Sequence, residues 1–386
     1  MIKDITEILH HLEENELSFG SVTPPIFQTS IFNYKNFKDF KNALLDEPNS
    51  YIYTRGNNPT VNILEKKLAE LEHGEKAKLV SSGIAAISNS ILAFVKSGDH
   101  IICVKDTYSW TKKLMENYLS RFNISHTYVE GNDIIEIKNA IKPNTKIIYL
   151  ESPTTFTFKL QNLKEISTLS KKHGIKTIID NTWATPIFQN PIDYGIDIVI
   201  HSASKYLGGH SDLVAGIIIG KKEDIRKIFE TEFQNIGTVP DPFVAWLILR
   251  GLRTLHIRME RHYKSSMEIV NFLKKHKKVE SVLYPFDKDY KQIQLAKKQM
   301  RGGSGLLSFK LKTRDLNKII KFTNSINFFK RAVSWGGYES LIIPYAVTLK
   351  ENELSNNENI SLIRIHVGLE NTELLMNDLN NALKNI

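Results

Sequence analysis

The sequence has almost no cysteine and no long apolar run. Cys103 is the only cysteine among its 386 residues, so an internal disulfide is excluded. It lies in a strand-like apolar run at residues 101–104, which favours a buried core position over a nucleophile. No apolar run approaches the ~20 residues that a membrane-spanning helix needs. We therefore expect a protein of the reducing cytoplasm, without a membrane partner.

Several other signals are missing from the sequence as well. It contains no metal-ligating motif, no repeat and no low-complexity segment, and the spacing of His256 and His262 matches no metal site. Residues 1–16 mix acids with apolar residues at helical spacing, which predicts an amphipathic helix and not a secretory signal. The net charge is +9, but the lysines are spread out with acids among them. This pattern predicts no nucleic-acid partner and suits small anionic ligands.

The composition is that of a globular protein, with 41% hydrophobic and 24% charged residues. The length is sufficient for a large core and two domains. From about residue 77 to residue 220, short apolar runs alternate with helical patterns. This alternation predicts an α/β fold with a mostly parallel sheet.

Two apolar runs near the middle of the chain, residues 177–179 and 196–200, predict buried strands. The first run ends on Asp180, and Lys205 follows the second. Chemistry in a parallel α/β sheet lies past the carboxyl ends of the strands, so both side chains are candidates for one crevice. Taken singly, such an Asp is more often a helix cap and such a Lys a solvated charge. Together they suit pyridoxal 5'-phosphate (PLP), which needs a lysine Schiff base and a carboxylate at the ring nitrogen.

The stretch HSASKYLGGHSD, residues 201–212, resembles the Schiff-base motif of the Cys/Met-metabolism PLP-dependent enzymes, the cystathionine γ-synthase family. Ser202 and Ser204 stand beside the lysine, where their hydroxyls suit the cofactor phosphate. The resemblance extends from about residue 24 to about residue 383 and is closest to the bacterial cystathionine β-lyase branch. It implies the PLP-dependent transferase fold type I. The expected parts are an N-terminal arm (1–55), a PLP-binding domain (56–240) and a smaller C-terminal α/β domain (241–386).

Tyr53 and Arg55 match a Y-x-R pair that binds the cofactor phosphate of the neighbouring subunit in this family. The planar fork of donors on an arginine suits a phosphate, although a surface loop is the alternative interpretation. The resemblance therefore implies a homodimer with shared sites, commonly paired into a tetramer. It also implies that the N-terminal arm reaches over the partner subunit.

Two further positions match cofactor contacts of the family. A turn that contains Gly83 leads from a predicted strand into a predicted helix, and a helix N-terminus of this kind binds anions. The resemblance places the phosphate on the N–H groups of Gly83 and Ile84, whereas any strand-to-helix loop can contain a glycine. Tyr108 matches a tyrosine that stacks on the cofactor ring, although it could simply cap the sheet. A phenol with a lowered pKa can also move protons.

Three residues near the C-terminal end match substrate contacts. Arg364 lies in a predicted strand within residues 362–370, and a buried arginine requires a partner. The resemblance implies that Arg364 binds the substrate α-carboxylate, together with the backbone near Ser334. A structural ion pair is the alternative. Trp335 resembles the β-lyases, because γ-synthases typically carry Leu at this position. The two glycines that follow it predict a close approach of the backbone there.

Two departures from the family pattern favour the β-lyase branch. Trp110 stands where similar methionine γ-lyases carry a cysteine. Thr155 stands where γ-synthases and γ-lyases carry an asparagine that contacts the ring hydroxyl. The bacterial β-lyase branch also lacks that asparagine.

The predicted activity is β-elimination of L-cystathionine to homocysteine, pyruvate and ammonia. Lys205 takes the α-proton, and Lys205 or Tyr108 gives a proton to the leaving thiolate. The alternatives within the family are a cysteine desulfhydrase, a γ-lyase or a γ-synthase. An alternative of another class is a PLP-binding regulator with vestigial activity, but the sequence has no appended DNA-binding module. The polar run at residues 351–359 predicts a surface loop.

Overall fold

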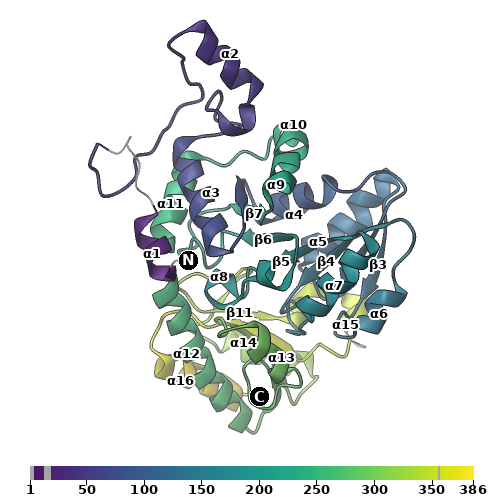
Figure 1. Cartoon of the computed structure of the whole chain (residues 1–386). Coiled ribbons are helices and arrows are strands. Elements are labelled where there is room, and N and C mark those ends of the chain that lie inside the picture. Colours follow the sequence, from purple (N-terminus) through teal and green to yellow (C-terminus); the bar gives the residue numbers. More distant parts are fainter. Residues whose placement is uncertain (1–3, 13–18, 355–356) are drawn as a thin grey trace.

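A computed structural model describes residues 4–12, 19–354 and 357–386 of the chain (Figure 1). Within these residues the larger sheet has seven strands in the order β1-β7-β6-β5-β4-β2-β3. The strands are β1 (Lys76–Val80), β2 (His100–Val104), β3 (Ser125–Val129), β4 (Thr145–Glu151), β5 (Lys176–Asp180), β6 (Ile198–Ser202) and β7 (Gly216–Gly220). The runs that predicted buried strands therefore lie in β5 and β6, with β6 starting two residues later than its run.

Most strands of the large sheet are parallel, as expected. Strands β3, β2, β4, β5 and β6 run parallel to their neighbours, whereas β7 is antiparallel to both β6 and β1. Strands β2, β4, β5, β6 and β7 are isoleucine-rich and largely buried on both faces, which is why their apolar runs are continuous rather than alternating. Cys103 is fully buried in β2, in agreement with a core role.

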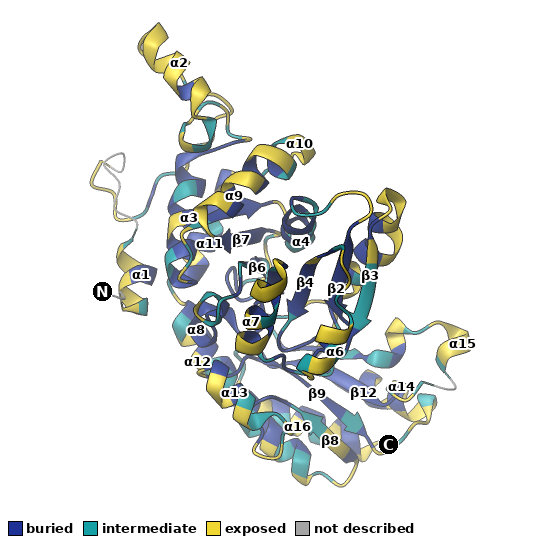
Figure 2. Ribbon diagram, turned by 45° about the vertical axis from the view of Figure 1, so that its right-hand side comes forward, coloured by how far each residue is buried: buried dark blue, intermediate teal, exposed yellow. Residues whose placement is uncertain are grey.

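Helices cover both faces of the large sheet (Figure 2). On one face lie α3 (Pro59–Leu71) and α7 (Leu163–His173), and on the other lie α4 (Gly83–Leu92) and α9 (Lys222–Ile228). The start of α3 follows from local chemistry, because Asn58 Oδ1 accepts the Thr60 N–H at 3.0 Å and Pro59 occupies the first turn. The shorter helices around this sheet are α5 (Ser109–Lys113), α6 (Ile134–Asn139), α8 (Thr185–Phe188) and α10 (Gln234–Ile236).

The second sheet of the described chain has five strands in the order β10-β11-β12-β9-β8, antiparallel except for β10 and β11. They are β8 (Val279–Leu283), β9 (Leu306–Leu311), β10 (Lys330–Arg331), β11 (Leu341–Pro344) and β12 (Leu362–His366). The accompanying helices are α12 (Leu255–Lys275), α13 (Ile293–Gln299), α14 (Leu316–Asn324) and α16 (Thr372–Lys384). A smaller C-terminal α/β unit is thus present. The helix before it, α11 (Pro242–Leu252), packs against α3 of the large unit, so the boundary at residue 240 stays a prediction.

The N-terminal part has two separate helices, α1 (Ile5–His11) and α2 (Phe37–Leu45). The predicted helix over residues 1–16 corresponds to α1, with residues 1–3 and 13–16 outside the described chain. Lys67, which is fully buried, donates from Nζ to the Leu9 carbonyl at 2.8 Å and so fixes α1 to α3. Helix α2 projects from the top of the molecule (Figure 1), and Phe37 and Leu45 on it are strongly exposed.

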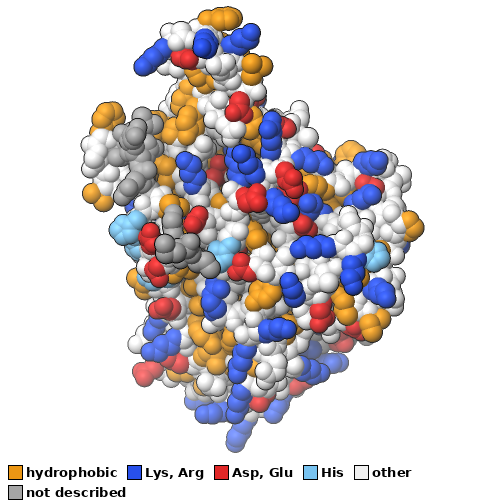
Figure 3. Space-filling model, viewed as in Figure 1, with side chains coloured by type: hydrophobic (Ala, Val, Ile, Leu, Met, Phe, Trp, Pro, Cys, Tyr) orange, Lys and Arg blue, Asp and Glu red, His pale blue; other side chains and the backbone are white. Residues whose placement is uncertain are grey.

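Two surface features complete the description. The predicted loop at residues 351–359 contains a short helix, α15 (Glu351–Leu354), while residues 355–356 lie outside the described chain. Lysines and arginines on the visible face are scattered among acidic side chains (Figure 3), as the sequence predicts. None of the helices in the described segments is long and apolar enough to cross a membrane.

Candidate active site

The candidate site is built at the carboxyl edge of the large sheet. Glu151 is the last residue of β4 and Asp180 the last of β5, and the two are paired in register. Lys205 follows β6 in a tight turn, where its N–H donates to the Ser202 carbonyl at 3.1 Å. The charge of Lys205 lowers the pKa of Asp180, and the charge of Asp180 raises the pKa of Lys205. The structure therefore brings together the two residues that the sequence singled out.

Lys205 has the environment of a reactive amine. It is half-buried, its Nζ donates a hydrogen bond to Ser334 Oγ, and Nζ lies 5.7 Å from the centre of the Trp335 ring. Burial and then the positive charge of Arg364 lower its pKa to about 8, against the opposing effect of Asp180. A substantial fraction of the amine is therefore uncharged in mildly alkaline solution, as a base or nucleophile requires.

The segment that carries Ser334 and Trp335 approaches Lys205 closely because of a glycine. Gly336 has a φ of +85°, and a Cβ atom there would lie 2.8 Å from the Tyr206 nitrogen and 3.0 Å from the Lys205 carbonyl carbon. No other residue fits this position without displacing the backbone of the lysine turn. Ser334 itself has a φ of +83°, which is unusual for serine. The close approach that the paired glycines predicted is confirmed.

The lowered pKa of Lys205 gives a pH-dependent prediction for the cofactor-free protein. Below about pH 8 the buried amine is charged in the folded chain, which costs stability. Unfolding restores its ordinary pKa, so this cost disappears as the pH rises from about 8 towards the unfolded value of about 10.5. We expect Lys205→Met to raise the free energy of unfolding by about 1–2 kcal/mol near pH 7 and by much less near pH 10. Urea denaturation of both proteins at the two pH values measures this, and equal gains at both would contradict it.

Asp180 and Glu151 form a carboxylate pair of unequal character. Asp180 Oδ1 accepts hydrogen bonds from the N–H (2.9 Å) and the hydroxyl of Thr182. Burial raises the pKa of Asp180, but these bonds and the nearby His201 and Lys205 oppose the rise. Burial and the charge of Asp180 raise the pKa of Glu151 well above its ordinary value. Hence the pair favours a protonated Glu151 beside an ionised Asp180.

Arg364 is a buried cation at the meeting point of the two sheets. It lies on β12 with 8% of its surface exposed, and its guanidinium donates to Thr155 Oγ1 at 3.1 Å and lies 4.5 Å from the centre of the Phe156 ring. Burial lowers its pKa to about 10, so it remains charged at neutral pH. In the described part of the chain no carboxylate lies within ion-pair distance of it, although the charge of Glu151 partly opposes the lowering of its pKa. Such a charge requires an anionic ligand.

The N-terminus of α4 is the candidate position for an anion. The Ser82 hydroxyl oxygen caps the Ala85 N–H at 3.1 Å, which leaves the N–H groups of Gly83 and Ile84 without intrahelical acceptors. A Cβ atom on Gly83 would lie 2.8 Å from Ser202 Oγ, so the glycine lets that hydroxyl reach the helix end. The Ser204 hydroxyl, unlike that of Ser202, is bonded to the backbone of Ala215. It donates to the Ala215 carbonyl at 3.2 Å and accepts the Ala215 N–H at 3.0 Å.

Tyr108 stands beside the carboxylate pair. Its backbone N–H donates to Glu151 Oε2 at 2.8 Å, and 43% of the residue is exposed. Burial, then the charges of Asp180 and Glu151, raise the pKa of its phenol. A phenol with a raised pKa stays protonated at neutral pH, so Tyr108 lacks the lowered pKa that a phenolic base needs.

Tyr53 and Arg55 lie apart from this cluster. Arg55 Nε donates to Gln234 Oε1 at 2.9 Å, and its guanidinium lies 5.5 Å from the centre of the Tyr53 ring. Both residues are exposed and line a hollow of about 650 Å³ with residues 28–30 and 239–242. Throughout residues 4–12, 19–354 and 357–386, no hydrogen bond or ion pair joins them to Lys205 or Asp180.

The residues present fit PLP. The end of α4 with Ser202 offers donors for a phosphate, Asp180 is a carboxylate for the ring nitrogen, and Lys205 is a half-buried amine. The half-exposed Tyr108 ring is placed for a flat aromatic ligand. Sequence reasoning gave no role to Glu151, Phe156 or Lys159. The rule that found Asp180, an acid at the end of a buried strand, applies equally to Glu151.

The fold and this set of residues define a PLP-dependent α/β enzyme. Comparison with known families makes the class specific. The profile of the family described as Cys/Met metabolism PLP-dependent enzyme matches residues 5–384. The chain therefore belongs to this family, and PLP is its cofactor.

Individual relatives include two kinds of lyase. The chain is 39% identical to an L-methionine gamma-lyase of Treponema denticola, over 95% of this chain and 93% of the relative. It is 38% identical to a cystathionine beta-lyase of Lactococcus lactis subsp. cremoris, over 98% of both. Among solved structures, metB from Corynebacterium glutamicum superposes with a TM-score of 0.90 and 31% identity, covering 99% of this chain and 98% of that one. The chain has the fold type I architecture of PLP enzymes. Overall identity does not separate the two lyases.

Proposed function

We propose that the protein is a cystathionine β-lyase, which cleaves the C–S bond of L-cystathionine to homocysteine, pyruvate and ammonia. The observation that carries the proposal is the buried Arg364, which has no ion pair within the described residues, near the Lys205 amine of lowered pKa. This pair provides a cation for an α-carboxylate and a base for the neighbouring α-proton. Relatives named cystathionine beta-lyase match over 98% of the chain, and Trp335, Trp110 and Thr155 favour β-elimination.

PLP, when bound, supplies an electron sink that makes the α-proton of an amino acid acidic. Arg364 binds the α-carboxylate through its donor fork and orients the α-C–H bond. The uncharged Lys205 amine takes the α-proton, and the hydrogen bond to Ser334 keeps Nζ in place for this. The Asp180 carboxylate holds the proton of the ring nitrogen, because the neighbouring Glu151 carries no charge to compete with it.

The leaving thiolate needs a proton, and two groups can give it. Lys205 has one after it takes the α-proton. Tyr108 has one because its raised pKa keeps the phenol protonated. The sulfur then leaves as a neutral thiol, which prevents its return to the β-carbon.

A second candidate activity is γ-elimination of L-methionine. It is favoured by the relatives named L-methionine gamma-lyase, which match at 39% identity over 95% of the chain. The ratio of kcat/KM for L-cystathionine to that for L-methionine separates the two. Our proposal predicts a ratio well above one with the PLP-loaded enzyme, and a ratio below one would favour the second candidate.

We further propose a homodimer, of the kind that pairs into tetramers, in which Tyr53 and Arg55 complete the partner's phosphate site. Both are exposed and lie apart from Lys205 of their own chain. The projecting helix α2, with its exposed Phe37 and Leu45, provides an apolar surface for a second copy. A shared site of this kind would make an isolated subunit inactive.

Subunit mixing tests the shared site. Lys205→Ala and Arg55→Ala chains each lack one half of every site. After subunit exchange, a mixed dimer has one site with both residues intact and one with neither. We expect activity to return to about a quarter of the wild-type value, because half of the dimers are mixed and half of their sites are complete. Activity no greater than the sum of the separate variants would contradict the proposal.

A further inference from the structure

The loop after β4 makes the contacts that define the position of Arg364. Thr155 accepts the guanidinium hydrogen bond, and the guanidinium carbon lies over the Phe156 ring, 4.5 Å from its centre. The Phe156 ring also packs against the Tyr345 ring. The two ring centres are 5.1 Å apart and the rings meet edge to face. The loop therefore places one polar and one aromatic group on a cation that has no carboxylate partner in the described chain.

The backbone of this loop needs external support. Phe156 and Phe158 have φ values of +60° and +56°, a region that aromatic residues rarely adopt. The loop closes on itself through the Phe158 N–H, which donates to the Thr154 carbonyl at 3.1 Å. A strained backbone of this kind persists only where surrounding contacts hold it.

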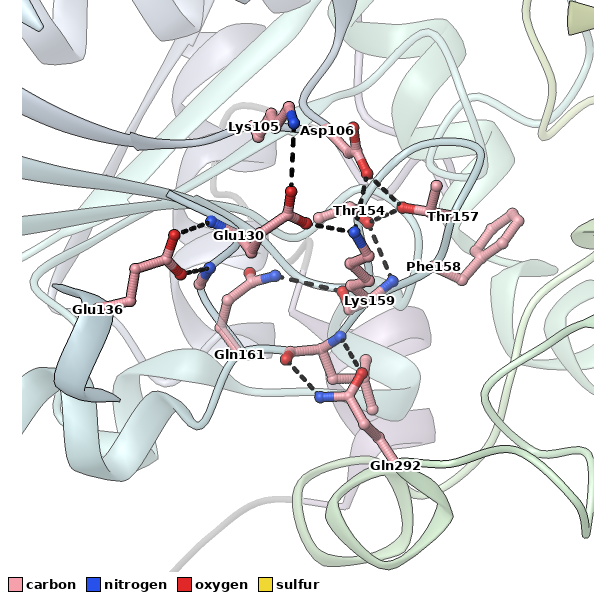
Figure 4. A network of polar contacts seen from close by, with 12 residues as sticks. Lys105, Asp106, Glu130, Glu136, Thr154, Thr157, Phe158, Lys159, Gln161 and Gln292 are labelled. Carbon is pink, nitrogen blue, oxygen red and sulfur yellow. Dashed lines mark hydrogen bonds and ion pairs between the residues drawn. The ribbon is translucent and has the colours of Figure 1, made fainter. Parts of the chain in front are cut away.

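Asp106 and Lys159 provide that support (Figure 4). The Asp106 carboxylate accepts the Thr157 hydroxyl at 2.8 Å and lies 3.6 Å from Lys159 Nζ. The Asp106 carbonyl accepts the Thr155 N–H at 3.0 Å. Lys159 Nζ also donates to Glu130. Asp106 thus holds the loop through both its side chain and its backbone.

Further contacts fix the ends of this network. Glu130 also pairs with Lys105 at 3.4 Å, and its own N–H donates to Glu136 at 2.9 Å. Beyond Lys159, both backbone groups of Leu160 bond to the side chain of Gln292, at 2.9 and 2.8 Å (Figure 4). Gln292 stands immediately before α13, so the loop is also anchored to the C-terminal unit.

The network reaches the cofactor side of the site as well. Asp106 is separated from Tyr108 by one residue, and the Tyr108 N–H is bonded to Glu151 at the start of the same loop. The network therefore connects the segment of the stacking tyrosine with the segment that contacts Arg364. Burial opposes the charge on Lys159, but its bond to Glu130 and the charge of Asp106 raise its pKa, so it stays a cation.

We propose that Lys159 and Asp106 are positioning residues for the substrate carboxylate: they hold the loop so that Thr155 and Phe156 fix the Arg364 guanidinium. This inference rests on the role of Arg364 in the proposed function. Neither residue touches the substrate, and their effect passes through the loop. Loss of Lys159 should therefore weaken the capture of the amino acid and leave the acid–base step largely intact.

The test is Lys159→Met in the PLP-loaded enzyme, with L-cystathionine as substrate. We expect KM to rise about tenfold, kcat to change less than about threefold, and the affinity for PLP to stay the same. Lys159→Arg should restore KM, because a guanidinium also reaches Asp106 and Glu130. Thr157→Val is a second variant that stays informative if Lys159→Met folds poorly. It removes the hydroxyl bonds to Asp106 and Thr154 but keeps Lys159, and it should raise KM by a smaller factor.

Lys105→Met is the matched control, because the Lys105 side chain also pairs with Glu130 but is 62% exposed. Within the described residues it makes no hydrogen bond or ion pair with Asp106 or the loop. Its KM should equal that of the wild type. A KM for Lys159→Met equal to that of Lys105→Met, or a loss confined to kcat, would overturn the inference. Product identity tests the proposed function separately, so a γ-elimination product with a raised KM would refute β-elimination and support the positioning role.

Discussion

Lys205→Ala is expected to lower kcat for L-cystathionine by about a thousandfold or more, even with excess PLP. The substitution removes both the amine that holds the cofactor and the base for the α-proton. In the proposed mechanism no neighbouring group replaces it, because the raised pKa of Tyr108 keeps its phenol protonated and Asp180 is assigned to the ring nitrogen. The measurement is steady-state turnover at saturating substrate, together with the visible absorption of the PLP-loaded protein.

Lys221→Ala is the matched control for this experiment. Lys221 is an exposed lysine just before α9, remote in its contacts from the Lys205 turn. It should leave both turnover and absorption unchanged. Retention of more than about a tenth of wild-type turnover in Lys205→Ala would contradict the role of Lys205 as base, since a general base contributes at least about a hundredfold.

Replacement of Arg364 with methionine is expected to lower kcat/KM by about a hundredfold to a thousandfold. Truncation of one partner of a buried charged pair costs about 2–5 kcal/mol of binding free energy, and here the partner is the substrate carboxylate. Most of the loss should appear in KM. The kcat/KM of Arg364→Lys should lie between the values of the wild type and Arg364→Met, because lysine keeps the charge but lacks the planar fork of donors.

Stability separates this binding role from a structural one. Arg364 is buried without an ion pair in the described chain. Its contacts with Thr155 and Phe156 and the nearby charge of Glu151 offset only part of the cost of burying its charge, since its pKa is lowered. Arg364→Met should therefore keep or raise the denaturation midpoint of the cofactor-free protein. Arg314→Met, at an exposed position, is the control and should change neither quantity. A large loss of stability in Arg364→Met would show that the arginine is structural.

The parts that sequence predicts well are those fixed by short-range patterns. The runs in β5 and β6 are apolar because both faces of those strands are buried, and this alone placed Asp180 and Lys205 at one edge of the sheet. The same holds for the Gly83 turn and the close approach at Gly336, since both need the absence of a Cβ atom.

The remaining features depend on contacts between distant parts of the chain. Thr155 and Arg364 are 209 residues apart and meet only where the two sheets meet. The loop conformation at Phe156 has no sequence signal, because phenylalanine does not favour a positive φ. The antiparallel course of β7 and the non-helical segment between α10 and α11 were also unpredicted. The proposed ligand of Tyr53 and Arg55 belongs to a partner subunit, so contacts within one chain do not place these two residues at a site.

The most direct test of the proposed β-elimination is identification of the products from L-cystathionine with the PLP-loaded enzyme. Arg364 and Lys205 as assigned predict pyruvate and homocysteine in equal amounts, with ammonia. 2-Oxobutyrate with cysteine would contradict this account, because it would show cleavage on the γ-carbon side of the sulfur despite Trp335 and Thr155.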